Sequence, residues 1–123
     1  MNSESDIKQD FETALVKHML FKSKLRSFLY GTQLAEGPVR DADQCGLGIW
    51  IQERWQGPLG SVSEWFELDR VHRQLHAEAN KLMDMYQQGF QEQAREGLAD
   101  LLPLTDRVPR LLQTIQDKLR TPR

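Results

Sequence analysis

The sequence contains a single cysteine, Cys45, among its 123 residues. One cysteine cannot form an intrachain disulfide, which excludes the disulfide-rich class of small secreted proteins. The N-terminal stretch is polar and acidic and lacks the basic and apolar regions of a signal peptide. No apolar run approaches the roughly 20 residues that span a bilayer. We therefore expect a cytoplasmic protein in a reducing compartment, with no membrane association.

Basic and β-branched residues are also in short supply. The 16 Lys and Arg residues are outnumbered by 18 Asp and Glu residues, which gives a formal net charge of -2. Nucleic-acid binders usually carry a basic surplus, so we expect no nucleic-acid partner. Because Leu, Gln, Glu, Lys and Arg are plentiful, the composition favours helix over sheet. The length predicts one all-α domain over residues 1–123.

Apolar residues recur at helical spacing in four segments. The first segment begins near residue 5 and meets no Gly or Pro until Gly31. The second is short and carries residues 45–51. The third opens at Ser61 or Ser63, where Ser61 with Glu64, or Ser63 with Glu67, gives a capping-box pattern, and it ends at Gly89. These segments predict three helices joined by short loops.

The fourth segment has the most regular pattern of the chain. Its apolar seam alternates spacings of four and three residues: Ala94, Leu98, Leu101, Thr105, Val108, Leu112, Ile115 and Leu119. Because the seam keeps its phase across Pro103 and Pro109, we predict one helix kinked by proline, with a break near Pro103 as the alternative. Four amphipathic helices with short loops predict an antiparallel four-helix bundle.

Two histidines, His72 and His76, are four residues apart and lie on the apolar stripe of the third helix. This spacing is common by chance, but two imidazoles facing a core are hard to explain without a ligand. The remaining His and Cys residues are His18, on the apolar stripe of the first helix, and Cys45. Taken alone, each has an ordinary explanation as a buried hydrogen-bonded imidazole or a small core thiol.

In a bundle, His18, Cys45 and the histidine pair can converge in the core. Three imidazoles and one thiolate suit tetrahedral Zn²⁺, whereas Ca²⁺ and Mg²⁺ prefer oxygen ligands. Gly46 and Gly48 follow the cysteine, and each costs about 1 kcal/mol relative to Ala in a helix. That cost suggests a close backbone approach, by another helix or toward the ligand atoms.

The chain resembles the chemoreceptor zinc-binding domain (CZB) family. Three blocks carry the resemblance: His18 in a long first helix, residues 45–50 and residues 72–76. Phe21 stands where the family often has Trp, three residues after its first His. Family members bind zinc through three His and one Cys in a four-helix bundle, are often dimeric, and occur fused to bacterial chemoreceptors and diguanylate cyclases.

The resemblance implies that His18, Cys45, His72 and His76 are zinc ligands and that the chain forms a homodimer. It also implies a regulatory role of the signal-transduction or chemotaxis type, in which zinc, or an oxidant acting on the Cys–Zn pair, controls output. No signalling coiled coil or cyclase domain accompanies the predicted bundle. We therefore expect the output to pass through a signalling protein partner.

Two other functions compete with this prediction. In a metal-free helical interaction bundle, the His and Cys residues are ordinary core residues. A zinc hydrolase needs a vacant coordination position and a general base, but Arg73 follows His72 where the zincin motif has Glu. We therefore expect no enzymatic activity. Asp69 and Glu78 are candidates to orient an imidazole, although surface solvation is the ordinary role of each.

Overall fold

The structure is a computed structural model that describes residues 4–120. Its described residues form six helices and no strand, which confirms the all-α prediction. The helices are α1 (Glu4–Leu29), α2 (Gly37–Arg40), α3 (Gly46–Trp55), α4 (Glu64–Gln87), α5 (Gln91–Asp100) and α6 (Leu102–Arg120). The first and last three residues of the predicted domain lie outside the described range.

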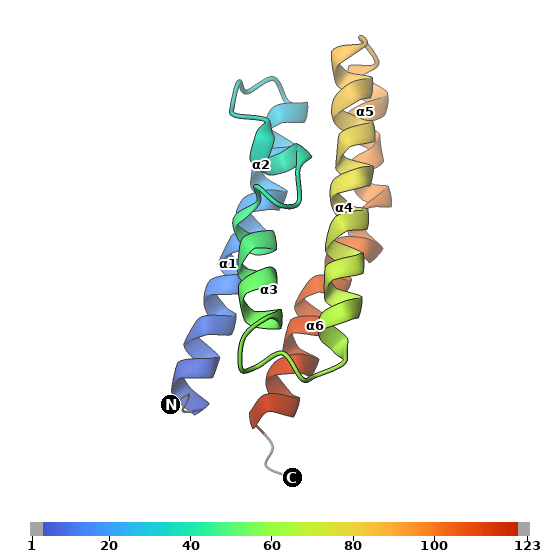
Figure 1. Ribbon diagram of the computed structural model, residues 1–123. Helices are drawn as coiled ribbons and strands as arrows, with labels where there is room; N and C mark the ends of the chain where they lie inside the picture. The colour runs from blue at the N-terminus through green and yellow to red at the C-terminus, as the bar shows by residue number, and fades with distance from the viewer. Residues whose placement is uncertain (1–3, 121–123) are drawn as a thin grey trace.

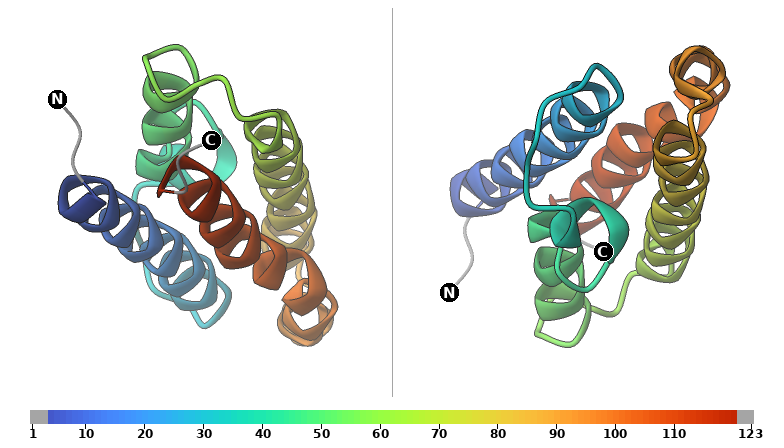
Figure 2. Two further views of the ribbon diagram at one scale, coloured as in Figure 1. Left: turned by 90° about the horizontal axis from the view of Figure 1, so that it is seen from below. Right: turned by 90° about the horizontal axis from the view of Figure 1, so that it is seen from above.

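The long helices lie side by side around a common interior. Figure 1 shows α1 running up from the N-terminus, α3 running back down beside it, α4 running up, and α5 and α6 returning downward. The end views of Figure 2 agree with the contacts, in which α3 and α6 each pack against both α1 and α4. None of the helices within residues 4–120 combines the length and apolar character needed to cross a bilayer.

Glycines end two of the helices, as the sequence predicted. Gly31 and Gly89 have φ angles of 99° and 101°, a left-handed conformation that favours Gly and stops helix propagation. The predicted capping box at the start of α4 is wrong. Ser63 has helical backbone angles and its hydroxyl bonds to Glu64 instead of a backbone N–H. The backbone carbonyls of Val62 and Ser63 accept the N–H groups of Trp65 and Phe66.

The predicted fourth helix consists of two helices, α5 and α6, separated by Leu101. Pro103 has no N–H to donate to the carbonyl of Ala99, and proline disfavours helical geometry at the residue before it. The helix therefore ends before the proline, and a new helix begins with Pro103 in its first turn, where proline is tolerated. A single helix kinked by proline is not confirmed, whereas the break near Pro103 matches the alternative. Pro109 lies inside α6.

A continuous core joins these elements. Phe11 of α1 packs edge-on against Trp50 of α3, with ring centroids 5.0 Å apart, and Trp65 of α4 lies 5.5 Å from Trp50. Much of the predicted seam is buried as well, including Ala94, Val108 and Ile115. This apolar packing holds α1, α3, α4 and α6 together and places His18, two turns after Phe11 on α1, in the interior.

Candidate metal centre

Cys45 lies at the N-cap of α3, with an extended backbone and a side chain that is 4% exposed. Asp41 is the C-cap of α2, and its carboxylate accepts the backbone N–H of Asp43. The turn between the two helices therefore places the thiol in the interior directly before the first residue of α3.

Gly48 explains how the start of α3 can approach its neighbours so closely. A Cβ atom at this position would lie 1.8 Å from the carbonyl oxygen of Ala42 and 3.0 Å from Cε1 of His72. The predicted close approach is therefore present at Gly48. At Gly46 the nearest atoms belong to the flexible side chain of Lys17, at 3.7 Å.

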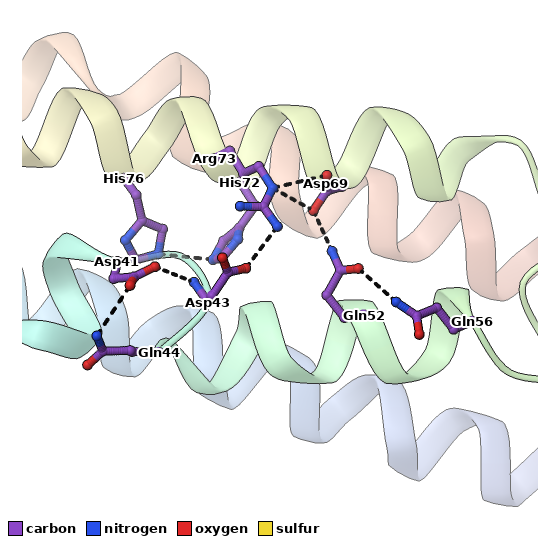
Figure 3. Close-up of polar contacts among 9 residues, drawn as sticks. All are labelled: Asp41, Asp43, Gln44, Gln52, Gln56, Asp69, His72, Arg73 and His76. Carbon is purple, nitrogen blue, oxygen red and sulfur yellow. Dashed lines mark hydrogen bonds and ion pairs between the residues drawn. The ribbon is translucent and has the colours of Figure 1, made fainter.

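His72 and His76 occupy successive turns of α4 and are 1% and 2% exposed. Figure 3 shows both rings pointing from α4 toward the segment that leads into α3. Their Nε2 atoms are 3.1 Å apart. Metal–nitrogen bonds of about 2.0–2.1 Å in tetrahedral geometry place two ligand nitrogens about 3.3 Å apart, so the pair is spaced as two ligands of one ion are.

The side chains of Cys45, His72 and His76 converge, and their ligand atoms all lie within 4.8 Å of one another. All three residues are buried. Two imidazoles and a thiol suit zinc and other borderline or soft transition metals, and they do not suit metals that require oxygen ligands. The donor set, its burial and its spacing therefore fit a bound transition-metal ion.

The environment keeps these imidazoles neutral. Burial, with the neighbouring His76 acting in the same direction, lowers the pKa of His72 to about 3. Burial also lowers the pKa of His76, against the opposing effect of its hydrogen bond to Val39. A neutral imidazole has the lone pair that metal coordination requires.

A backbone carbonyl fixes the orientation of His76. Its Nδ1 donates a hydrogen bond of 2.6 Å to the carbonyl oxygen of Val39, in α2. Because a carbonyl can only accept, the proton is on Nδ1 and the lone pair is on Nε2, which faces His72. The sequence did not reveal this contact, since α2 has only four residues and the interaction involves the backbone of Val39.

Arg40 holds α2 in the position that this contact needs. Its guanidinium bonds to Asn80, Asp84 and Gln87 along α4, at 2.9 to 3.0 Å. Asn80 donates in return to the backbone carbonyl of Arg40 at 2.8 Å. The short helix is thereby attached to the same face of α4 that carries His76.

His18 lies in the core at 2% exposure but is not part of the group of three. Its Nε2 donates to the carbonyl oxygen of Thr105 at 3.0 Å, and its Nδ1 is buried without a hydrogen-bond partner. Burial lowers the pKa of His18 to about 4. Phe21, one turn further along α1, packs on the ring of His76 with centroids 4.5 Å apart, so this face of α1 borders the group.

Charged side chains near the site form a polar network of their own. Arg73 bonds to Asp43 at 2.9 Å and to Asp69 at 3.2 Å, and Asp69 also accepts a bond from Gln52 of α3 (Figure 3). Glu78 pairs with Lys81. Neither Asp69 nor Glu78 therefore bonds to a histidine, and the polar network instead connects α4 to α3 and to the turn before it.

Comparison with known protein families gives a match that covers the candidate metal centre. The model of the chemoreceptor zinc-binding domain matches residues 18–83, just over half of the 123 residues. The match begins at His18 and includes Cys45, His72 and His76, whereas α5 and α6 lie beyond it. Comparisons with curated proteins and with solved structures give no significant match.

Proposed function

Because the chain belongs to the chemoreceptor zinc-binding domain family, we propose that it is a regulatory zinc-binding domain. The observation that carries this proposal is the convergence of three buried ligand atoms from Cys45, His72 and His76 within 4.8 Å. Bound at this site, zinc supplies a structural link between the start of α3 and the middle of α4.

We propose His18 as the fourth ligand. Its Nδ1 is a buried nitrogen without a hydrogen-bond partner, and its Nε2–H is already engaged by Thr105. A buried lone pair with no donor costs stability, and binding a metal removes that cost. With His18 included, the ion connects α1, α3 and α4, the first three of the four bundle members that we propose, with the α5–α6 segment as the fourth.

The regulation of zinc binding that we propose depends on the thiol of Cys45. Oxidation of Cys45 to a sulfenic acid takes away the thiolate ligand and weakens zinc binding. A pocket of about 120 Å³ reaches Cys45 between α1 and α2 and is also lined by Lys17 and Lys24. This opening gives a small oxidant a route to the buried sulfur. Loss of zinc then loosens the helices that the ion connects, and a partner protein can detect that change.

The test is a zinc titration of the wild type and of Cys45→Ser, with metal analysis of the purified protein. We expect one zinc per chain in the wild type and much weaker binding in Cys45→Ser. Gly46→Ala is the matched control, because it changes the adjacent residue in an ordinary contact environment and removes no donor. Equal affinity in wild type and Cys45→Ser would exclude Cys45 as a ligand and the redox mechanism with it.

Metal analysis also separates the competing functions. A metal content near zero after growth with ample zinc would favour a metal-free interaction bundle. An exchangeable water on the bound metal would favour a hydrolase. We propose no catalytic activity, because Arg73 follows His72 in the sequence where the zincin motif has its Glu, and its guanidinium pairs with Asp43 and Asp69.

We further propose that the chain forms a homodimer through α1. Val16, Met19 and Leu20 lie on one face of this helix, and each side chain is more than half exposed. Exposed apolar side chains that are grouped in this way favour association. Sedimentation should give a dimer for the wild type and a shift toward monomer for Met19→Glu, whereas Arg110→Gln, an exposed change on α6, should remain dimeric. A monomeric wild type would contradict the proposal.

The identity of the partner and the cellular setting rest on the family resemblance and on composition. We propose a signalling protein of the chemotaxis or signal-transduction type as the partner, and the cytoplasm as the location. Cross-linking in cells, with and without oxidant, tests the partner. Fractionation tests the location, and recovery of the protein outside the cytoplasmic fraction would contradict it.

A further inference from the structure

We propose that Pro109, in the interior of α6, is a positioning residue for His18. The proposal rests on the zinc-binding function proposed above and adds a contribution from a helix that lies beyond the family match. Pro109 acts through the backbone carbonyl of Thr105, which it leaves free to accept a hydrogen bond from the imidazole.

The first step concerns the backbone of α6. In an α-helix, the N–H of residue 109 donates to the carbonyl of residue 105. Proline has no N–H, so Pro109 leaves the carbonyl of Thr105 without its helical donor. Thr105 is 6% exposed, and a buried carbonyl without a partner is costly. The helix therefore needs a donor from elsewhere in the molecule at this position.

His18 supplies that donor. Its Nε2 lies 3.0 Å from the carbonyl oxygen of Thr105, across the interface between α1 and α6. Since a carbonyl oxygen only accepts, Nε2 must carry the proton, and Nδ1 must be the unprotonated nitrogen. The freed carbonyl thus selects one tautomer and one ring orientation of His18.

The selected tautomer is the one that a metal requires at Nδ1. That nitrogen is buried and has no hydrogen-bond partner, so its lone pair is not used within the protein. His76 is held in the same manner with the nitrogens exchanged, because its Nδ1–H donates to Val39 and its Nε2 faces the site. Two backbone carbonyls that lack helical donors therefore orient two imidazoles. The carbonyl of Val39, in α2, orients His76, and the carbonyl of Thr105, four residues before Pro109, orients His18.

A purely structural role for Pro109 makes a different prediction. If the proline only shapes α6 around the core, its replacement changes stability and leaves the His18 tautomer unaffected. If it acts through Thr105, its replacement restores a competing N–H donor and releases the imidazole. The two roles are therefore separated by measurements on the ring itself.

The experiment compares Pro109→Ala with Pro103→Ala, which changes the other proline of α6. The carbonyl that Pro103 deprives of a helical donor belongs to Ala99, and no histidine of the described chain donates to it. Long-range ¹H–¹⁵N NMR of the metal-free protein reports the His18 tautomer, and competition with a chromophoric chelator gives the zinc Kd. In the metal-free state we expect Pro109→Ala to melt at the same temperature as the wild type or higher, because the helical hydrogen bond is restored. We also expect it to lose the single Nε2–H tautomer and to bind zinc about 10- to 100-fold more weakly. Pro103→Ala should keep the wild-type tautomer and Kd.

An unchanged tautomer and an unchanged Kd in Pro109→Ala would overturn the proposal. So would an Nδ1–H tautomer of His18 in the wild type, a measurement that needs no variant and decides the question even if Pro109→Ala fails to fold. If the wild type binds no zinc, the proposed function fails. The tautomer comparison between wild type and Pro109→Ala still tests the role of Pro109 in that case.

Discussion

At the scale of single residues, Gly48 sets how closely α3 can approach the site. A Cβ atom added at this position would lie 1.8 Å from the carbonyl oxygen of Ala42 and 3.0 Å from Cε1 of His72. A backbone carbonyl cannot move aside as a flexible side chain can. Gly48 therefore determines both the packing of α3 and the position of one proposed ligand.

We expect Gly48→Ala to lower the free energy of unfolding by about 1–3 kcal/mol, because the added methyl group forces α3 away from the turn before it. The displaced His72 should also weaken zinc binding. Chemical denaturation and zinc titration measure the two effects.

Gly46→Ala is the control for this substitution. Its Cβ would lie 3.7 Å from the Lys17 side chain, an ordinary contact, and Ala favours a helix over Gly by about 1 kcal/mol. We therefore expect Gly46→Ala to equal or exceed the wild type in stability. Equal stability of the two alanine variants would contradict the role assigned to Gly48.

At the scale of helices, Asp10 joins α1 to α3. Its carboxylate accepts hydrogen bonds from Nε and Nη2 of Arg54 at 2.5 and 2.8 Å and from Nε1 of Trp50 at 3.1 Å. Burial raises the pKa of Asp10, but the hydrogen bonds from Arg54 and Trp50 and the charge of Arg54 outweigh it and hold the pKa below its ordinary value.

A lowered pKa in the folded state means that the ionised carboxylate stabilises the fold. This contribution is complete above the ordinary carboxyl pKa of about 3.9 and is lost as the pH falls through the lower folded value. We expect Asp10→Asn to cost about 1 kcal/mol at pH 7, since the pair is partly exposed. The difference from wild type should shrink below pH 4. Urea denaturation at several pH values measures it.

Glu12→Gln, an exposed change on the same helix, is the control and should stay within about 0.5 kcal/mol of wild type. A gap between Asp10→Asn and wild type that did not vary with pH would show that lost packing, and not lost charge, caused the destabilisation.

A similar prediction concerns Arg40, which joins α2 to α4. Arg40→Met removes the bonds to Asn80, Asp84 and Gln87 and keeps an apolar stem of similar length. We expect amide exchange in residues 37–45 to rise about tenfold, a loss of about 1.4 kcal/mol of local stability. Arg110→Met, an exposed change on α6, should leave this segment as protected as in the wild type. Unchanged exchange in Arg40→Met would mean that α2 is held by other contacts, such as the buried Val39.

The sequence predicted the helices better than their ends and junctions. Apolar periodicity places α1 and α4 correctly, and Gly31 and Gly89 end them, because these signals are local. The helix α2 was missed because Gly37 and Pro38 are typical of a loop. The division at Leu101 could not be chosen in advance, since a proline kinks a helix or ends it according to the packing around it.

Only the ligand side chains of the site could be predicted from the sequence. From residue type and spacing we identified His18, Cys45, His72 and His76 as a cluster, and the structure brings Cys45, His72 and His76 together but leaves His18 outside that group. The partners that orient the rings are the backbone carbonyls of Val39 and Thr105, which no side-chain pattern reveals. Thr105 is 87 residues from His18 in the chain, so their contact exists only in the assembled fold.

At the scale of the whole molecule, zinc removal should loosen α1, α3 and α4 together. A ligand at 100 times its Kd stabilises the folded state by about 2.7 kcal/mol, so we expect a strong chelator to lower Tm by about 10 °C. Scanning calorimetry with and without chelator measures the shift. Added Zn²⁺ should restore Tm, whereas Mg²⁺ should not, because it prefers oxygen ligands. A Tm that changes neither with the chelator nor with added Zn²⁺ would contradict a zinc-stabilised fold.

The convergence of Cys45 with His72 also has a topological consequence. These residues lie on either side of α3 and the connection that follows it, so an ion bound to both closes that stretch of chain into a ring. A cross-link of this kind restricts the unfolded chain, as a disulfide does, yet this chain has only one cysteine. If the ion is zinc, as we propose, the ring opens only when zinc leaves, and the unfolding rate should fall as the zinc concentration rises.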